Sequence, residues 1–343
     1  MEIIDAFCHW LPSEYLALID RSTNNNLHMF HRARGIASMV SLDARFRIMD
    51  EFPNYRQIPS LASPSVEMLV CKDCSPDLAR QANDIMAGLV GRHPERFAGF
   101  VAALPLNDPD ACVEEMYRAY RTLSASGFQL FTSINGLPLD DPMFEPLFAC
   151  AAEIQCPFWL HPIGGAVMPD YPGEDVSKHD IWWSLGWPHE TAKAMVRLVF
   201  SGLFERHRHL KILTHHAGGT LPMLEGRLDA GMSVTASRSP SFEKKEALIK
   251  RSEAPITGLR RFYGDTATFG AVAPLVCGLS FLGASKIVFA SDMPFDPEGG
   301  PGYIRSTLQA LDSIDLTSEQ RRDILSENIR RFANLKETAS MAL

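Results

Sequence analysis

Short apolar runs recur along the whole chain, and most of them show no alternation with polar positions. Ile287–Ala290 is the clearest example, because β-branched and aromatic residues follow one another there without a polar position. Such a run is typical of a strand that is covered by helices on both faces of a parallel sheet. The same criterion predicts eight strands: Ile3–Phe7, Gln57–Leu61, Gly99–Leu104, Gly127–Phe131, Pro157–Leu160, Lys211–Thr214, Phe262–Tyr263 and Ile287–Ala290.

Stretches with apolar residues three and four positions apart lie between these strands and predict helices. They cover residues 75–94, 108–123, 140–154, 189–207 and 317–335. Strands that alternate with helices pair in parallel through crossover connections. Eight such units predict a (β/α)₈ TIM barrel that forms a single domain over residues 1–343, with an insertion at about 13–56 and a C-terminal helix at about 317–335. An open doubly wound sheet is the alternative, but the G-x-G-x-x-G turn typical of that fold is missing from the sequence.

The segment 166–188 is rich in Pro, Gly and Trp and has no periodic pattern. It is predicted to be a long irregular loop after the fifth strand. Long irregular loops in compact domains are commonly functional.

Charge and composition exclude several classes of function. The chain has 41 acidic and 33 basic residues and no Lys/Arg-rich run, which argues against a nucleic-acid partner. The acidic N-terminus does not resemble a signal peptide, and no apolar run is long enough to span a membrane. The seven cysteines are scattered, with Cys71 and Cys74 in one isolated C-x-x-C, and we expect reduced thiols in a cytoplasmic protein.

Polar residues follow five of the eight predicted strands. In a barrel, the carboxyl ends of the strands converge on the mouth that carries the active site. Taken singly, each histidine there is more often structural, and each aspartate could form a turn or cap a helix. Together, imidazoles and carboxylates from separate strands indicate one divalent-metal site. The residues concerned are His9, His161, His215, His216, Asp265 and Asp292.

One of these histidines is expected to stay off the metal and act as the general acid or base, because imidazole titrates near neutral pH. His215 and His216 are neighbours, and successive side chains of a strand point to opposite faces. Only one of the two should therefore face the mouth, and spacing alone does not decide which.

These segments, in the order IDAFCHWLP, LHP, the stretch from Leu185 to Arg227, FYGDTA and ASDMPF, resemble the amidohydrolase superfamily. Within it the chain is similar to the branch of aminocarboxymuconate-semialdehyde decarboxylase and the resorcylate-type decarboxylases. The similarity covers nearly the whole chain, and the stretch from Leu185 to Arg227 is its most specific part.

The resemblance implies roles for individual residues. His9, His161 and Asp292 match ligands of one divalent metal, Zn or Mn. Aligning HHAGGTLP through its proline and glycines matches His216 to the catalytic histidine, and Asp292 would share in proton transfer. Phe7 is a departure, since the family places a His or Glu ligand there and a phenyl ring cannot bind a metal.

The resemblance also implies how substrate binds. Arg227 matches an arginine that reaches across a dimer interface to a substrate carboxylate, and Trp183 matches an aromatic wall of the site. A homodimer or higher homo-oligomer is therefore expected. Arg45 and Arg47 could contact an anionic substrate or could lie on a solvated helix face.

The sequence thus predicts a metal-dependent enzyme that removes CO2 without oxidation from an aromatic or unsaturated carboxylic acid. A hydrolase or hydratase on the same scaffold is the first alternative, because a metal-bound water could attack a carbonyl or alkene carbon. A metal-free binding homologue is the second, because of Phe7.

Overall fold

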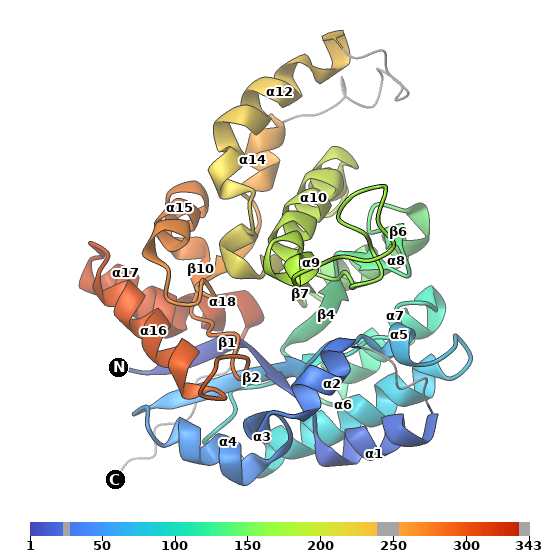
Figure 1. The fold of residues 1–343 in the computed structure, drawn as a ribbon, viewed down its shortest axis with the longest axis vertical. Helices are drawn as coiled ribbons and strands as arrows, with labels where there is room; N and C mark the ends of the chain where they lie inside the picture. The colour runs from blue at the N-terminus through green and yellow to red at the C-terminus, as the bar shows by residue number, and fades with distance from the viewer. Residues whose placement is uncertain (23–27, 239–253, 336–343) are drawn as a thin grey trace.

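Eight parallel strands form a barrel at the centre of the molecule (Figure 1). The computed structural model describes residues 1–22, 28–238 and 254–335 of the chain. The barrel strands are β1 (Ile3–Trp10), β2 (Tyr55–Leu61), β3 (Val101–Ala102), β4 (Gly127–Phe131), β7 (Phe158–His161), β8 (Ile212–Thr214), β9 (Tyr263–Asp265) and β10 (Ile287–Val288).

Backbone hydrogen bonds close the barrel. Six strands pair in the order β10-β9-β8-β7-β4-β3, and β1 pairs with β2. Ala6 N donates to Phe289 O at 2.9 Å, which joins β1 to the segment after β10. Gln57 N donates to Arg96 O at 3.0 Å and Gln57 O accepts from Ala98 N at 2.8 Å, which joins β2 to the segment before β3. The predicted TIM barrel is confirmed.

Helices surround the barrel and follow the strands in chain order (Figure 1). Four lie between β1 and β2: α1 (Ser13–Ser22), α2 (His28–Arg34), α3 (Ala37–Val40) and α4 (Leu42–Met49). The next are α5 (Val66–Leu69), α6 (Ser75–Arg92), α7 (Pro109–Arg121), α8 (Glu145–Glu153), α9 (Ile181–Ser184), α10 (Gly186–Phe200), α11 (Leu203–Arg206) and α12 (Glu225–Arg238). The last are α14 (Pro255–Leu259), α15 (Val272–Leu282), α16 (Pro301–Asp312), α17 (Ser318–Arg322) and α18 (Asn328–Ala333).

Shorter elements complete the described fold. A small antiparallel hairpin, not expected from the sequence, joins β5 (Ser133–Ile134) and β6 (Leu137–Pro138). Tight helical turns are η1 (Pro142–Phe144), η2 (His216–Gly218), η3 (Pro222–Leu224), η4 (Ala284–Lys286) and the π-helical η5 (Asp323–Glu327). The expectation of an irregular loop through residue 188 is wrong at its end, since α9 and the start of α10 lie inside that range. Three neighbouring tryptophans supply apolar surface there that packing can order despite the weak periodicity.

Apolar side chains from alternate strand positions fill the barrel interior. Trp159 is its largest member and is fully buried, and its Nε1 donates to the carbonyl of Ala6 at 2.6 Å. A Cβ atom at Gly127 would lie 2.0 Å from the Trp159 ring, so only glycine fits on β4 at that point. Phe332 of α18 contacts the same ring, with ring centroids 5.1 Å apart. The C-terminal helix therefore contributes to the packing of the barrel interior.

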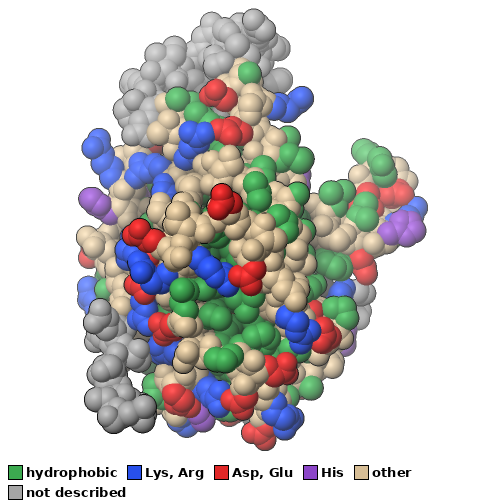
Figure 2. All heavy atoms as spheres, turned by 90° about the vertical axis from the view of Figure 1, so that its left-hand side faces the viewer, with side chains coloured by type: hydrophobic (Ala, Val, Ile, Leu, Met, Phe, Trp, Pro, Cys, Tyr) green, Lys and Arg blue, Asp and Glu red, His purple; other side chains and the backbone are tan. Residues whose placement is uncertain are grey.

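The surface agrees with the charge balance of the sequence. On the face shown in Figure 2, acidic and basic side chains are interspersed rather than gathered by sign. Cys71 and Cys74 are exposed and free, with their sulfur atoms 3.4 Å apart. Among the helices that the structure describes, none combines the length and apolar character needed to cross a bilayer.

Candidate active site

A partly enclosed cavity of about 280 Å³ lies where the carboxyl ends of β1, β7 and β8 meet. It contains five of the residues singled out from the sequence, so the structure brings together side chains that are up to 283 positions apart in the chain, from His9 to Asp292. Its lining residues are His9, Arg32, Ser63, His161, Trp183, Ser184, Trp187, Pro188, His216, Phe269, Asp292, Phe295 and Tyr303.

Arg45 fixes the backbone of the strand that carries His9. Its Nη1 donates to His9 O at 2.8 Å and to Ser38 O at 3.2 Å, and its Nε donates to Gln57 Oε1 at 2.6 Å. The side chain is fully buried and does not line the cavity, so both expectations for Arg45, substrate contact and a solvated helix face, are wrong. Arg47, on the same helix, is exposed.

Three buried imidazoles share one pattern of hydrogen bonding. His161 Nδ1 lies 2.6 Å from Pro162 O, and a carbonyl only accepts, so Nδ1 carries the proton. His215 Nδ1 lies 2.5 Å from the carboxylate of Asp265, and His9 Nδ1 lies 3.3 Å from Ser60 Oγ. A proton on Nδ1 leaves a lone pair on Nε2, which is the arrangement found in metal-binding histidines.

The carboxylate of Asp292 lies among these nitrogens. Its Oδ1 is 3.1 Å from His9 Nε2 and 3.4 Å from His215 Nε2, and its Oδ2 is 3.7 Å from His216 Nε2. Burial alone would raise the pKa of Asp292, but the neighbouring histidines, His215 above all, hold it well below its usual range. Asp292 is therefore an anion facing several imidazoles.

The donor set fits a divalent cation. His9 Nε2 and His215 Nε2 are buried, and no hydrogen bond of good geometry satisfies either within the described part of the chain. Buried polar atoms rarely remain unsatisfied, so these two nitrogens indicate a missing positive partner. Burial, then the nearby His9, lower the pKa of His161 well below its ordinary value, which keeps this imidazole in the neutral form that can bind a metal.

Asp265 does not cap the helix that follows it. It ends β9, whereas the following helix α15 begins only at Val272. One oxygen bonds to His215, and the other accepts from Ala217 N at 3.0 Å and Ala267 N at 3.1 Å. Burial opposes protonation of His215, but the charges of Asp265 and Asp292 outweigh it and raise the pKa of His215 to about 10, so a cation bound at Nε2 would displace a proton.

Only His216 lines the cavity, as expected, but His215 and His216 both reach Asp292, so their side chains do not lie on opposite faces of a strand. The reason is that β8 ends at Thr214, so the alternation rule no longer applies. His216 has a left-handed backbone with φ of 57° and lines the cavity, whereas His215 is fully buried below it. The catalytic role of His216 stays a prediction.

Arg32 is a cavity residue that the sequence did not reveal. It lies on α2, in the region predicted as an insertion, and its guanidinium carbon is 4.7 Å from the ring centroid of Trp183. Both side chains line the cavity, which agrees with the expected aromatic wall at Trp183. A lone arginine in an irregular region carries no signal of this placement, because the position depends on how α2 packs over the barrel mouth.

Arg227 does not line the cavity of its own chain. It is exposed near the start of α12, a helix that projects from the barrel (Figure 1). The role of Arg227 across an interface stays a prediction.

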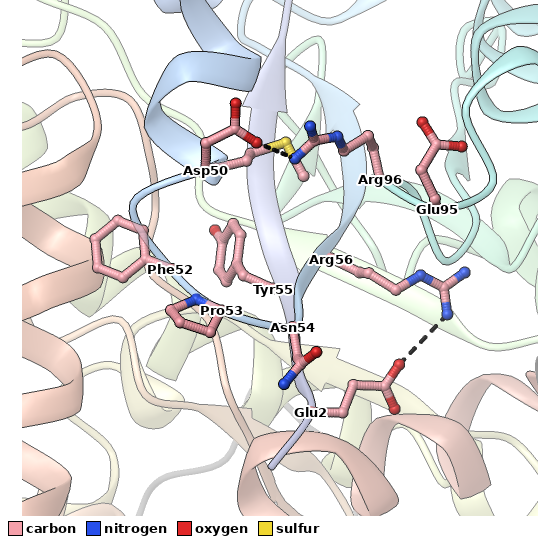
Figure 3. A pocket seen from close by; sticks show the side chains of 10 residues that line it. Glu2, Asp50, Phe52, Pro53, Asn54, Tyr55, Arg56, Glu95 and Arg96 are labelled. Atoms are coloured by element: carbon pink, nitrogen blue, oxygen red, sulfur yellow. Dashed lines mark hydrogen bonds and ion pairs between the residues drawn. The ribbon is translucent and has the colours of Figure 1, made fainter. Parts of the chain in front are cut away.

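A second, more open hollow lies at the other end of β1 and β2, where these strands begin (Figure 3). Its cationic groups already have protein partners. Arg96 is 2.5 Å from Asp50, and Arg56 is 3.4 Å from Glu2 and donates to the carbonyl of Pro94. In TIM barrels this end serves stability rather than catalysis, so the cavity at the carboxyl ends is the candidate site.

Known proteins resemble this chain in sequence. The sequence model of the amidohydrolase family matches residues 4–335. The chain is 30% identical over 269 residues to the gamma-resorcylate decarboxylase of Rhodococcus jostii (strain RHA1), covering 74% of this chain and 77% of that protein. It is 28% identical over 267 residues to the 2-amino-3-carboxymuconate-6-semialdehyde decarboxylase of Dictyostelium discoideum, covering 76% of this chain and 67% of that protein.

Solved structures show the same fold. The 5-carboxyvanillate decarboxylase from Sphingomonas paucimobilis superposes with a TM-score of 0.82 at 23% identity, covering 98% of this chain and all (100%) of that one. A dihydroxybenzoic acid decarboxylase from Polaromonas sp. JS666, solved with manganese and the inhibitor 2-nitroresorcinol, superposes with a TM-score of 0.75 at 23% identity, covering 100% of this chain and 99% of that one.

Proposed function

The chain belongs to the amidohydrolase family and is an enzyme, and from this premise we propose that it catalyses metal-dependent, non-oxidative decarboxylation of an aromatic or unsaturated carboxylic acid. One observation carries the proposal. Buried histidine nitrogens and the anionic Asp292 converge on one point at the base of a cavity whose walls are aromatic. The decarboxylases of aromatic acids among its relatives support the same reaction.

His9, His161 and Asp292 would hold one divalent cation, Zn or Mn. When bound, the cation would supply positive charge for the substrate carboxylate and an adjacent oxygen. Trp183, Trp187 and Phe295 line the cavity and would pack against the faces and edges of a flat ring. This packing fixes the ring so that its carboxyl-bearing carbon faces the histidines.

Arg32 would bind an anionic group of the substrate at the mouth of the cavity. Its guanidinium is always charged and matches a carboxylate in a two-point contact. Stacking on Trp183 restricts the guanidinium before substrate arrives, which lowers the entropy lost on binding.

His216 would deliver the proton that replaces the departing carboxyl group. Burial, then the neighbouring His215, lower the pKa of His216, so its protonated form is a stronger acid than a solvent-exposed imidazolium. Asp292 Oδ2, 3.7 Å from His216 Nε2, would stabilise that protonated form and share in proton transfer. The bond between the ring and the carboxyl carbon would then break, CO2 would leave, and the electron pair of that bond would return to the protonated ring and restore its aromaticity.

We further propose a single barrel domain over residues 1–343, a cytoplasmic location and a homodimer or higher homo-oligomer. In that assembly the exposed Arg227 of one copy would contact the substrate of another. A small-molecule carboxylic acid is the partner that the cavity fits.

Replacement of His216 tests the assignment of the proton donor. His216→Asn keeps a polar side chain of similar size and should lower turnover by about 10²- to 10⁴-fold, because general acid–base help of that size is lost. Metal content, measured by elemental analysis, should stay at the wild-type level. Unchanged turnover in this variant would show that another group protonates the substrate.

A further inference from the structure

The imidazole of His215 lies beside Phe7, the position of β1 at which the family resemblance implied a metal ligand. Phe7 is fully buried, and its ring stacks on that of His215 with centroids 4.0 Å apart and an interplanar angle of 16°. The phenyl ring therefore lies directly against an imidazole that comes from the end of another strand, β8.

We propose that His215 is a metal ligand of this chain and replaces the ligand missing at position 7. The inference rests on the proposed metal-dependent function and extends it. The cation would then be held by His9, His161, His215 and Asp292, with His216 beside them as the group that acts on substrate.

The hydrogen bonds of His215 match those of a metal-binding histidine. Its Nδ1 is held by Asp265 at 2.5 Å, while its fully buried Nε2 has no hydrogen-bond partner in residues 1–22, 28–238 and 254–335. A carboxylate behind a histidine orients the ring and makes its other nitrogen a better ligand. Asp265 is in turn fixed by the backbone N–H groups of Ala217 and Ala267, so the orientation of His215 is built into the fold.

The distances suit one shared cation. One nitrogen from each of His9, His161 and His215 lies within 4.8 Å of the others. Asp292 Oδ1 lies 3.1 Å from His9 Nε2 and 3.4 Å from His215 Nε2. Ligands bound at about 2.1 Å in a tetrahedron are separated by roughly 3.4 Å, so the two Asp292 distances already match those of bound ligands.

His216 differs from its neighbour in hydrogen bonding and exposure, although one of its ring nitrogens also lies within 4.8 Å of ligand atoms of His215 and Asp292. Its Nδ1 is without a hydrogen-bond partner in the described chain, its Nε2 faces the other oxygen of Asp292 at 3.7 Å, and it lines the cavity. His216 is thus positioned toward substrate, and His215 toward the point shared by the ligands. The pair supplies one ligand and one acid from a single strand end.

Metal affinity gives the first test, since it does not depend on knowing the substrate. Zn²⁺ and Mn²⁺ titrations by calorimetry should show binding to His215→Ala weakened by at least about 100-fold, because loss of an outer-shell partner alone typically costs 10- to 100-fold. His216→Ala is the matched control and should bind as tightly as wild type. Asp265→Asn should fall between the two, weakened by about 10- to 100-fold.

Cobalt spectroscopy gives the second test and is informative even if His215→Ala folds poorly. A thiolate bound to Co²⁺ produces a sulfur-to-cobalt charge-transfer band in the near ultraviolet. His215→Cys loaded with Co²⁺ should show that band above the wild-type spectrum, whereas His216→Cys should not. Wild-type affinity in His215→Ala together with no band in His215→Cys would overturn this inference alone. A wild-type protein that binds no divalent cation would overturn it together with the proposed function.

Discussion

Arg45→Met removes a buried cation while keeping most of the aliphatic volume of the side chain. The guanidinium donates to His9 O, Ser38 O and Gln57 Oε1, and it lies 5.1 Å from the centroid of the Trp10 ring. The substitution therefore releases the backbone of β1 at the residue that carries His9. Its effect should appear in both stability and metal binding.

The expected loss of stability follows from the groups left behind. Hydrogen bonds from a charged donor contribute about 1.5–3 kcal/mol each, and a buried acceptor without a partner costs about 1–3 kcal/mol. Removing the cation also removes its own desolvation cost, which offsets part of this loss. We therefore expect a decrease of about 3–5 kcal/mol in the free energy of unfolding, or roughly 4–7 °C in Tm for a chain of 343 residues.

Thermal melts and metal titrations check this expectation. Arg47→Met is the matched control, because Arg47 is exposed on the same helix and exposed substitutions usually change stability by less than about 0.5 kcal/mol. Arg45→Met should also bind metal more weakly than the control. Equal Tm values for the two variants would refute the role assigned to Arg45.

Two further substitutions separate binding from stability. Arg32→Gln should raise KM by about 10- to 100-fold with little change in kcat, since Arg32 would bind the substrate equally before and during reaction. The control is Arg34→Gln on the same helix, which breaks an exposed pair with Asp20 and should leave KM and kcat unchanged. Steady-state kinetics that show equal effects of the two substitutions would exclude Arg32 from the site. Burial raises the pKa of Glu67 from 4.5 to about 7, so the native state holds this proton more tightly and stability falls as pH rises through that interval. Glu67→Gln should remove that dependence, and above pH 7 its free energy of unfolding should exceed that of wild type by on the order of 3 kcal/mol. Thermal melts at pH 5 and pH 8 check this, and parallel changes in both proteins would contradict it.

The barrel and most of the site could be predicted because the signals are local in the sequence. Apolar runs mark strands that are buried on both faces, and His9 and His161 lie in the last two positions of β1 and β7, with Asp292 four residues after β10. Barrel closure then brings strand ends together whatever the details of packing.

Other features depend on tertiary packing and have no local signal. Arg45 has the sequence context of a surface residue, yet the packing of α4 against β1 and β2 buries it fully. Arg32 reaches the cavity only because α2 lies over the barrel mouth. The separate positions of His215 and His216 follow from a left-handed turn directly after β8, and strand alternation could not predict them.

The fate of the substrate carbon tests the central claim most directly. Metal-loaded enzyme would be incubated in deuterated, oxygen-labelled water with ring carboxylic acids that carry a neighbouring hydroxyl group, and products would be analysed by NMR and mass spectrometry. The account predicts one CO2 for each product and one deuterium at the carbon that bore the carboxyl group, with no labelled oxygen in the organic product. A product that keeps its carboxyl carbon and gains labelled oxygen would show hydrolysis or hydration, and would contradict decarboxylation.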